Sequence, residues 1–282
     1  MKPAASILRS GLCSVISRQT LFALSCLIFI ASCSCLDKQG SISTVPQGRG
    51  SKGYLTMESL PNSIAFLPPP PAEGTAAFAF DEEVTRNSLT LRGTPRWDLA
   101  RQDNTKSANA FSCTLNVQIS EQDTPHIYTL MRRTLDDAGF SATPAKIYYQ
   151  RPRPFVFNNE PICIDKPPGK YRSYPSSHTT LGWTWALILS EIAPEQSDAI
   201  LARGRAFGQS RVICNVHWQS DVNAGLLLGA AVVARLHAEP EFLATIEAAK
   251  VEFEVARAKD LSPERDCEAE AAALTSPLES TP

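Results

Sequence analysis

Between residues 81 and 256 the apolar positions of the chain recur mainly at helical spacing, and no run of alternating apolar and polar residues reaches strand length. The pair Thr124-Pro125 is typical of a helix start, and we expect the helix that follows to end at Gly139. Three further helices are predicted, over about 178–192, 194–207 and 220–237. The pattern therefore predicts an all-α fold, a helical bundle in a single domain.

The segments on either side of this pattern have a different composition. We place the helical domain at residues 76–257. Residues 36–75 are rich in Gly, Ser and Pro, which predicts a flexible tether. Residues 258–282 are polar and acidic, which predicts a disordered tail.

Residues 1–35 have the pattern of a signal peptide, in which three basic residues precede an apolar run over 21–31. The sequence Ile30-Ala31-Ser32-Cys33 resembles a bacterial lipobox, so Cys33 is a candidate for lipidation, and a plain signal peptide is the alternative. We therefore expect a periplasmic or secreted protein, with an outer-membrane lipid anchor if Cys33 is modified. No stretch after residue 35 is long and apolar enough to span a bilayer.

Composition narrows the function classes. With 43% apolar and 20% charged residues the chain is globular, and its formal net charge of −2 argues against a general nucleic-acid binder. Export permits disulfides, and among the cysteines after Cys33 we favour a Cys163–Cys214 pair over buried free thiols.

Three cations border apolar stretches in the segments most unusual in composition: Lys146, Arg153 and Arg211. Buried cations need counter-charge, and few acidic residues are near them in sequence, so a multivalent anion such as phosphate would satisfy all three. Ser176 and Ser177 lie where a helix should begin, and helix N-termini bind anions through unpaired N–H groups. The alternative is three unrelated surface cations.

Two of the four histidines fall in the same segments. Asp221 follows His217 by four residues and can hold its Nδ1–H, which leaves the Nε2 lone pair free for nucleophilic attack. His178 has no acidic neighbour in sequence and suits a general acid. A metal site on His178, His217 and Asp221 is a weaker alternative, because no further ligand lies nearby in sequence; we expect neither metal nor cofactor.

Together the three segments match the pattern K-x6-R-P, P-S-G-H, S-R-x5-H-x3-D, and the chain resembles the acid phosphatase and vanadium haloperoxidase superfamily. The runs RPRPFVF, RSYPSSHT and ILARGRAFGQSRVICNVHWQSDV resemble those of bacterial class A non-specific acid phosphatases. This resemblance implies an all-helical, metal-independent phosphomonoesterase with a phosphohistidine intermediate. It implies His217 as nucleophile, Asp221 as its orienting partner and His178 as proton donor. The phosphate-binding residues that it implies are Lys146, Arg153, Ser176, Ser177 and Arg211.

The chain departs from the family pattern at two positions. Ser177 stands where the family usually has glycine, and its Cβ and hydroxyl affect the approach to phosphate, so the geometry and rate are open while the activity class is not. Asn215 also replaces a common glycine, and Asn tolerates a left-handed backbone. The spacing from Lys146 selects Arg153 over Arg151, which we interpret as a residue behind the site.

We expect small phosphomonoesters and inorganic phosphate as ligands, no nucleic acid, and membrane association only through an N-terminal lipid; a homo-oligomer stays open. Three alternatives remain: a lipid phosphate phosphatase, a vanadate-dependent haloperoxidase, or a non-catalytic phosphate-binding lipoprotein.

Overall fold

The computed structural model describes residues 53–275. The predicted signal peptide, Cys33 and residues 276–282 lie outside this range. No strand occurs among the described residues, and the prediction of an all-α domain is confirmed. The longer helices are α2 (Ala76–Ser88), α3 (Pro95–Gln102), α5 (Pro125–Tyr149), α7 (Ser177–Ile192), α8 (Ser197–Ile213), α9 (Gln219–Leu236), α10 (Pro240–Ala258) and α11 (Cys267–Leu274). Shorter pieces are α1 (Ser63–Phe66), α4 (Ser112–Leu115), α6 (Pro154–Asn158), η1 (Leu89–Leu91), η2 (Ala108–Phe111) and η3 (Pro194–Gln196).

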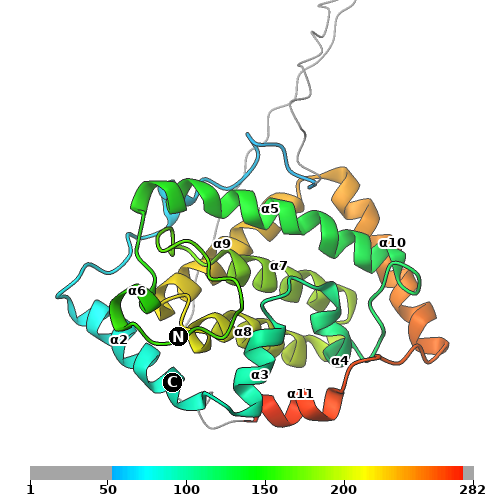
Figure 1. Ribbon diagram of the computed structural model, residues 1–282. Coiled ribbons are helices and arrows are strands. Elements are labelled where there is room, and N and C mark those ends of the chain that lie inside the picture. Colours follow the sequence, from blue (N-terminus) through cyan, green and yellow to red (C-terminus); the bar gives the residue numbers. More distant parts are fainter. Residues whose placement is uncertain (1–52, 276–282) are drawn as a thin grey trace, which may run out of the picture. The chain divides into compact units, whose positions relative to one another are not determined.

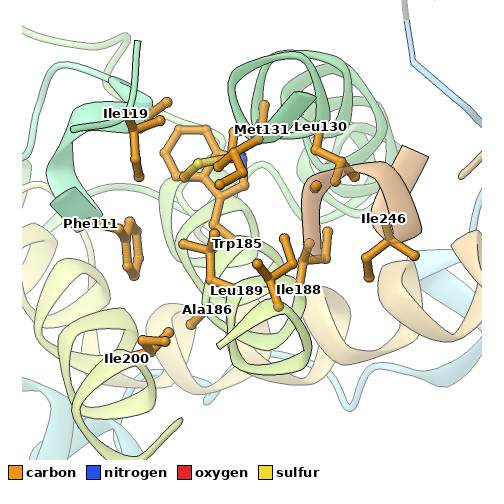
Figure 2. Close-up of a cluster of buried hydrophobic side chains, with 14 of the residues drawn as sticks. Phe111, Ile119, Leu130, Met131, Trp185, Ala186, Ile188, Leu189, Ile200 and Ile246 are labelled. Atoms are coloured by element: carbon orange, nitrogen blue, oxygen red, sulfur yellow. Dashed lines mark hydrogen bonds between the residues drawn. The ribbon is translucent and has the colours of Figure 1, made fainter. Parts of the chain in front are cut away.

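Helix α7 lies at the centre of the helical body, between α5, α8, α9 and α10 (Figure 1). Its sequence is apolar on nearly all faces, as expected of a helix surrounded by others. Trp185 is almost fully buried, and its Nε1–H donates to the Met131 carbonyl of α5 at 2.9 Å. Figure 2 shows Trp185 among Met131, Leu189 and other apolar side chains of this core. Ser176 and His178 therefore lie at the start of this buried helix.

Two glycines allow the first turn of α7 to approach its neighbours closely. A Cβ on Gly208 of α8 would lie 2.8 Å from Thr179 Cγ2. A Cβ on Gly225 of α9 would lie 2.7 Å from Thr179 Cβ and 2.8 Å from the Ser176 carbonyl oxygen. Both distances are shorter than carbon and oxygen atoms tolerate, so these contacts fix the start of α7 against α8 and α9.

The prediction that Gly139 ends the helix starting at Pro125 is wrong, because α5 continues to Tyr149. Ala138, Ala142 and Ala145 continue the buried face past the glycine, and this packing outweighs a glycine penalty of about 1 kcal/mol. The helix ends at Tyr149, and its C-cap, Gln150, has a left-handed backbone with φ 46°. As a consequence, Lys146 projects from the last turn of a core helix.

The described part of the predicted tether is not a tether. Leu55 is 2% exposed, and the N–H groups of Tyr54 and Leu55 donate to the Asp137 carboxylate at 3.0 Å each. The Asn62 side chain caps α1, which packs against α5. Composition was misleading here, because a few buried apolar residues and one buried carboxylate are sufficient to hold the segment.

The prediction of a disordered tail is also wrong for residues 258–275. Helix α11 begins at Cys267, which forms a disulfide with Cys113, and Glu270 accepts from Arg203 Nε at 3.1 Å. The predicted Cys163–Cys214 disulfide is confirmed. None of the helices within residues 53–275 is long and apolar enough to cross a bilayer.

We predict that Gly225→Ala lowers the free energy of unfolding by about 1–3 kcal/mol, because the new methyl group overpacks the start of α7. Gly139→Ala is the matched control: nothing lies within 4 Å of its Cβ, and alanine favours the helix by up to about 1 kcal/mol. Urea unfolding of both variants measures the difference. Equal stability of the two variants would contradict the close approach.

Candidate active site

The structure brings the three predicted segments together. His217 and Asp221 contact each other, and Arg153 contacts His217. Lys146 donates to the carbonyl of Ser173, three residues before Ser176. His178 and Arg211 are close enough to this group for their charges to interact with it. Residues from α5, α7, α8 and α9 therefore meet at one place.

His217 is held in one orientation. Its Nδ1 lies 3.2 Å from Asp221 Oδ2, and the residue is 3% exposed. Asp221 is the third residue of α9, and its Oδ2 also accepts the Trp218 N–H at 2.9 Å, so the same carboxylate caps the helix and holds the ring. With Nδ1–H donating to the carboxylate, Nε2 carries the lone pair.

The other oxygen of Asp221 is bound by Arg151, which sequence reasoning placed only behind the site. Arg151 Nη1 donates to Asp221 Oδ1 at 2.7 Å, and Nη2 donates to Asp81 Oδ2 at 2.8 Å. Asp81 Oδ1 also accepts the N–H of Ser220 at 2.8 Å. Asp81 was missed because it lies in α2, far from every motif, and only its burial at 1% exposure marks it.

Arg153 and Lys146 are anchored by backbone oxygens. Arg153 Nη1 donates to the Val216 carbonyl at 2.6 Å and lies 3.0 Å from His217 Nε2, while its Nε donates to Gly169. Lys146 Nζ donates to the carbonyls of Arg172 and Ser173 at 3.0 and 3.2 Å. Both cations are thus fixed in position by neutral carbonyl groups rather than by carboxylates.

Arg211 is 2% exposed, and its Nε and Nη1 have no hydrogen-bond partner among the described residues. A buried guanidinium whose donors are unpaired costs several kcal/mol, so these two donors suit the oxygens of a ligand. Arg211 precedes the turn that carries His217, and the N–H of His217 donates to its carbonyl. A ligand held by Arg211 would therefore lie beside His217.

The first turn of α7 contributes further donors. Ser176 is the N-cap, and its hydroxyl oxygen accepts from Thr179 N and Thr179 Oγ1, which leaves the hydroxyl hydrogen for a ligand. The backbone N–H of Ser176 is taken by the Asp221 carbonyl at 2.9 Å. Ser177 is the first helical residue, and its own N–H belongs to the unpaired set of a helix N-terminus.

His178 lies on the same turn, and its Nε2–H donates to the Asn104 carbonyl at 3.1 Å. This contact leaves Nδ1 as the nitrogen that exchanges a proton. Burial lowers the pKa of His178 well below its usual value, and the cations Arg211 and Lys106 lower it further. Burial, followed by Arg153, Lys146 and Arg211, likewise lowers the pKa of His217.

The site carries excess positive charge. Burial lowers the pKa of Lys146 to about 7, with the Arg153 cation as the next cause. Burial lowers the pKa values of Arg153 and Arg211 to about 10, and Arg153 also acts on Arg211. Asp221 faces these cations but is already paired with Arg151. A bound anion with several oxygens would neutralise this excess positive charge.

The turn that presents His217 depends on two local features. Asn215 has a left-handed backbone, φ 60°, as its tolerance for this conformation predicts, and its side chain exchanges hydrogen bonds with Asn158 at 2.9 and 3.0 Å. The Cys163–Cys214 disulfide joins the same turn to the loop after α6.

Comparison with known proteins identifies one family. Residues 133–241 match the model of the PAP2 superfamily. A non-specific acid phosphatase of Providencia stuartii is 44% identical over 208 residues, which cover 71% of this chain and 84% of the relative. A non-specific acid phosphatase of Salmonella typhimurium is 41% identical over 197 residues, 67% of this chain and 79% of the relative. An acid phosphatase of Zymomonas mobilis is 37% identical over 212 residues, 71% and 79% respectively.

We predict that Arg151→Lys lowers kcat for p-nitrophenyl phosphate at least tenfold, because an ammonium group cannot bridge Asp81 and Asp221 as the planar guanidinium does. The variant also loses stability, so kcat is measured at a temperature where circular dichroism shows it folded. Arg101→Lys, on the exposed face of α3, is the control and keeps both kcat and stability. If the folded Arg151→Lys enzyme has a kcat within twofold of the wild-type value, turnover does not depend on the guanidinium bridge between Asp81 and Asp221.

Proposed function

The chain belongs to the PAP2 superfamily, among its non-specific acid phosphatases, and is a phosphoric monoester hydrolase; we propose that it acts on phosphate monoesters of broad specificity through a covalent phosphohistidine at His217, without a metal ion. The observation that carries the proposal is the pairing of an oriented His217 with the unpartnered, buried donors of Arg211. His217 supplies a nucleophile, and Arg211 supplies donors for the phosphate oxygens.

In this proposal the phosphate binds among the cations and the start of α7. Arg211 donates through its Nε and Nη1, and Arg153 exchanges its contact with His217 Nε2 for a phosphate oxygen. Lys146 adds a point charge, and the Ser176 hydroxyl and Ser177 N–H complete the set. Preorganised donors of this kind stabilise the charge on a transferring phosphoryl group, which is the role a divalent ion has elsewhere.

The first chemical step transfers the phosphoryl group to the enzyme. The Nε2 lone pair of His217 forms the P–N bond while the bond from phosphorus to the ester oxygen breaks, and His178 Nδ1–H protonates that oxygen to release the alcohol. Asp221 stabilises the positive charge that forms on the His217 ring.

The second step returns the enzyme to its starting state. His178, now neutral, accepts a proton from water, and the water oxygen attacks phosphorus as the P–N bond breaks. Inorganic phosphate leaves, His217 is again neutral and His178 again protonated, so protons and bonds balance over the cycle.

The proposal also includes an extracytoplasmic location. Its support is the signal-peptide pattern in the sequence of residues 1–35, which lie outside the described structure. Lipidation at Cys33 is part of the proposal, because residues 30–33 resemble a lipobox. Mass spectrometry of the mature N-terminus distinguishes a lipidated Cys33 from a plain signal-peptide cut.

We predict that His217→Ala lowers kcat on the order of 10⁴–10⁶-fold, as deletion of a nucleophile does in other enzymes. His178→Ala loses about 10²–10⁴-fold on an alkyl phosphate and less on p-nitrophenyl phosphate, whose leaving group needs no proton. Exposed His126→Ala is the control and keeps full activity.

These assays contain EDTA, and brief exposure to ³²P-labelled substrate followed by alkaline denaturation traps the labelled histidine. Loss of wild-type activity on chelation, restored by a divalent metal, would sink the metal-free mechanism. Equal losses of His178→Ala on both esters would remove His178 from the role of proton donor.

A pH prediction follows from the low pKa of His178, which burial and then Arg211 and Lys106 produce. His178 must be protonated to donate, so this requirement fails as pH rises through its pKa, on the acid side of neutrality. His217 must be neutral to attack, and its own lowered pKa keeps it neutral in mildly acidic solution. The ratio of kcat/KM for an alkyl phosphate to that for p-nitrophenyl phosphate should therefore fall as pH rises from about 5 to 8. A ratio independent of pH, or an alkaline optimum, would contradict this assignment.

A further inference from the structure

The loop between α3 and η2 borders the site beside His178. It contains Asn104, whose carbonyl accepts the His178 Nε2–H at 3.1 Å, and Lys106 two residues later. Ser107 then caps η2 by accepting the Asn109 N–H at 3.3 Å. The backbone on both sides of Lys106 is thereby fixed, and it is fixed next to the proposed proton donor.

Lys106 is exposed and has neither a hydrogen bond nor an ion pair with any residue in the range 53–275. Its surroundings are nevertheless those of the site. Desolvation by the surrounding protein and then the Arg211 cation lower the pKa of Lys106, and Asp136 opposes them with a smaller effect. The charge of Lys106 also lowers the pKa values of His178 and Lys146. Burial and Arg211 have larger effects than Lys106 on the pKa of His178, and burial and Arg153 have larger effects on that of Lys146.

Lys106 therefore adds a fourth cation to a group that already lacks counter-charge. The three others have places around the transferring phosphoryl group, whereas Lys106 comes from the loop that contacts His178. The loop contacts Nε2 of His178, and the proposed proton donor, Nδ1, belongs to the same ring, so the loop borders the place where the alcohol departs in the proposed mechanism. A solvent-exposed ammonium there can meet the alcohol part of the substrate.

We propose that Lys106 binds an anionic group on the leaving alcohol, a carboxylate or a second phosphate, and makes this enzyme prefer phosphomonoesters of acidic alcohols to those of neutral ones. The inference rests on the proposed function, because it uses His178 to define the leaving-group side. In this inference Lys106 determines substrate specificity. It affects which phosphomonoesters are hydrolysed fastest and takes no part in breaking the P–O bond.

The test compares substrates that differ in one anionic group. The first pair is 3-phosphoglycerate and glycerol 3-phosphate, in which a carboxylate replaces a hydroxymethyl group; the second is 1,3-propanediol bisphosphate and its monophosphate. For each pair the ratio of kcat/KM values, acidic over neutral, is the readout. The pair whose ratio depends more strongly on Lys106 identifies carboxylate or phosphate as the preferred group.

Lys106→Met should lower this ratio about 1.5- to fivefold, the range of an exposed charge pair. Lys106→Glu should lower it further, and Lys106→Arg should preserve it. Lys250→Met on α10 is the matched control, with the wild-type ratio. Added salt should lower the wild-type ratio more than that of Lys106→Met, because the variant lacks the exposed charge that salt screens most strongly.

A ratio unchanged in Lys106→Met for both pairs overturns the inference. Equal losses on acidic and neutral substrates also overturn it, since Lys106 would then act on the transferring phosphoryl group. Both results are distinct from failure of the proposed function, in which the wild-type enzyme with EDTA forms no phosphohistidine from any of the four esters.

Discussion

The Asp221 carboxylate is the constraint on which the site depends. It is fully buried, and its two oxygens have different partners, because Oδ2 holds His217 and the N–H of Trp218 whereas Oδ1 receives Arg151. The backbone carbonyl of the same residue accepts the Ser176 N–H, which ties the start of α9 to the start of α7. One residue therefore positions the proposed nucleophile, the proposed anion-binding turn and the helix cap. Asp81 fixes that residue from behind through Arg151.

Because the donors around Asp221 already satisfy its charge, the side of the site proposed to bind phosphate has no anion of its own. The low pKa values of Lys146, Arg153 and Arg211, each caused first by burial, express the cost of keeping three cations together inside the protein. In the proposed function a bound phosphate dianion removes this cost. Part of the affinity for phosphate would thus be prepared during folding, when the packing of α5, α7 and α8 holds the cations in place.

Local patterns predicted most of this arrangement. The apolar repeat located α7 and α9 within a residue or two at their starts, and the short spacings around Lys146, Ser176 and His217 identified the residues that the fold brings together. What sequence could not predict depends on long-range contacts. Gly139 lies inside α5 because of packing against other helices. A few buried apolar residues and a buried carboxylate hold residues 53–75, and a disulfide and buried ion pairs hold α11. Asp81, in α2, and Lys106, in a loop, carry no motif at all.

The C-terminal helix illustrates how such long-range contacts influence the site. Arg203 of α8, which is nearly fully buried, donates to both oxygens of Asp103 and to Glu270 of α11. Ser210 also donates to Asp103 at 2.6 Å. Such buried ion pairs add little net stability compared with apolar packing, but the loss of one partner costs about 3–5 kcal/mol, so they fix geometry. Asp103 directly precedes Asn104, the residue that orients His178. The α11 segment, which composition alone marks as a tail, therefore supports the loop that contacts His178 and carries Lys106, the two residues proposed to act on the leaving group.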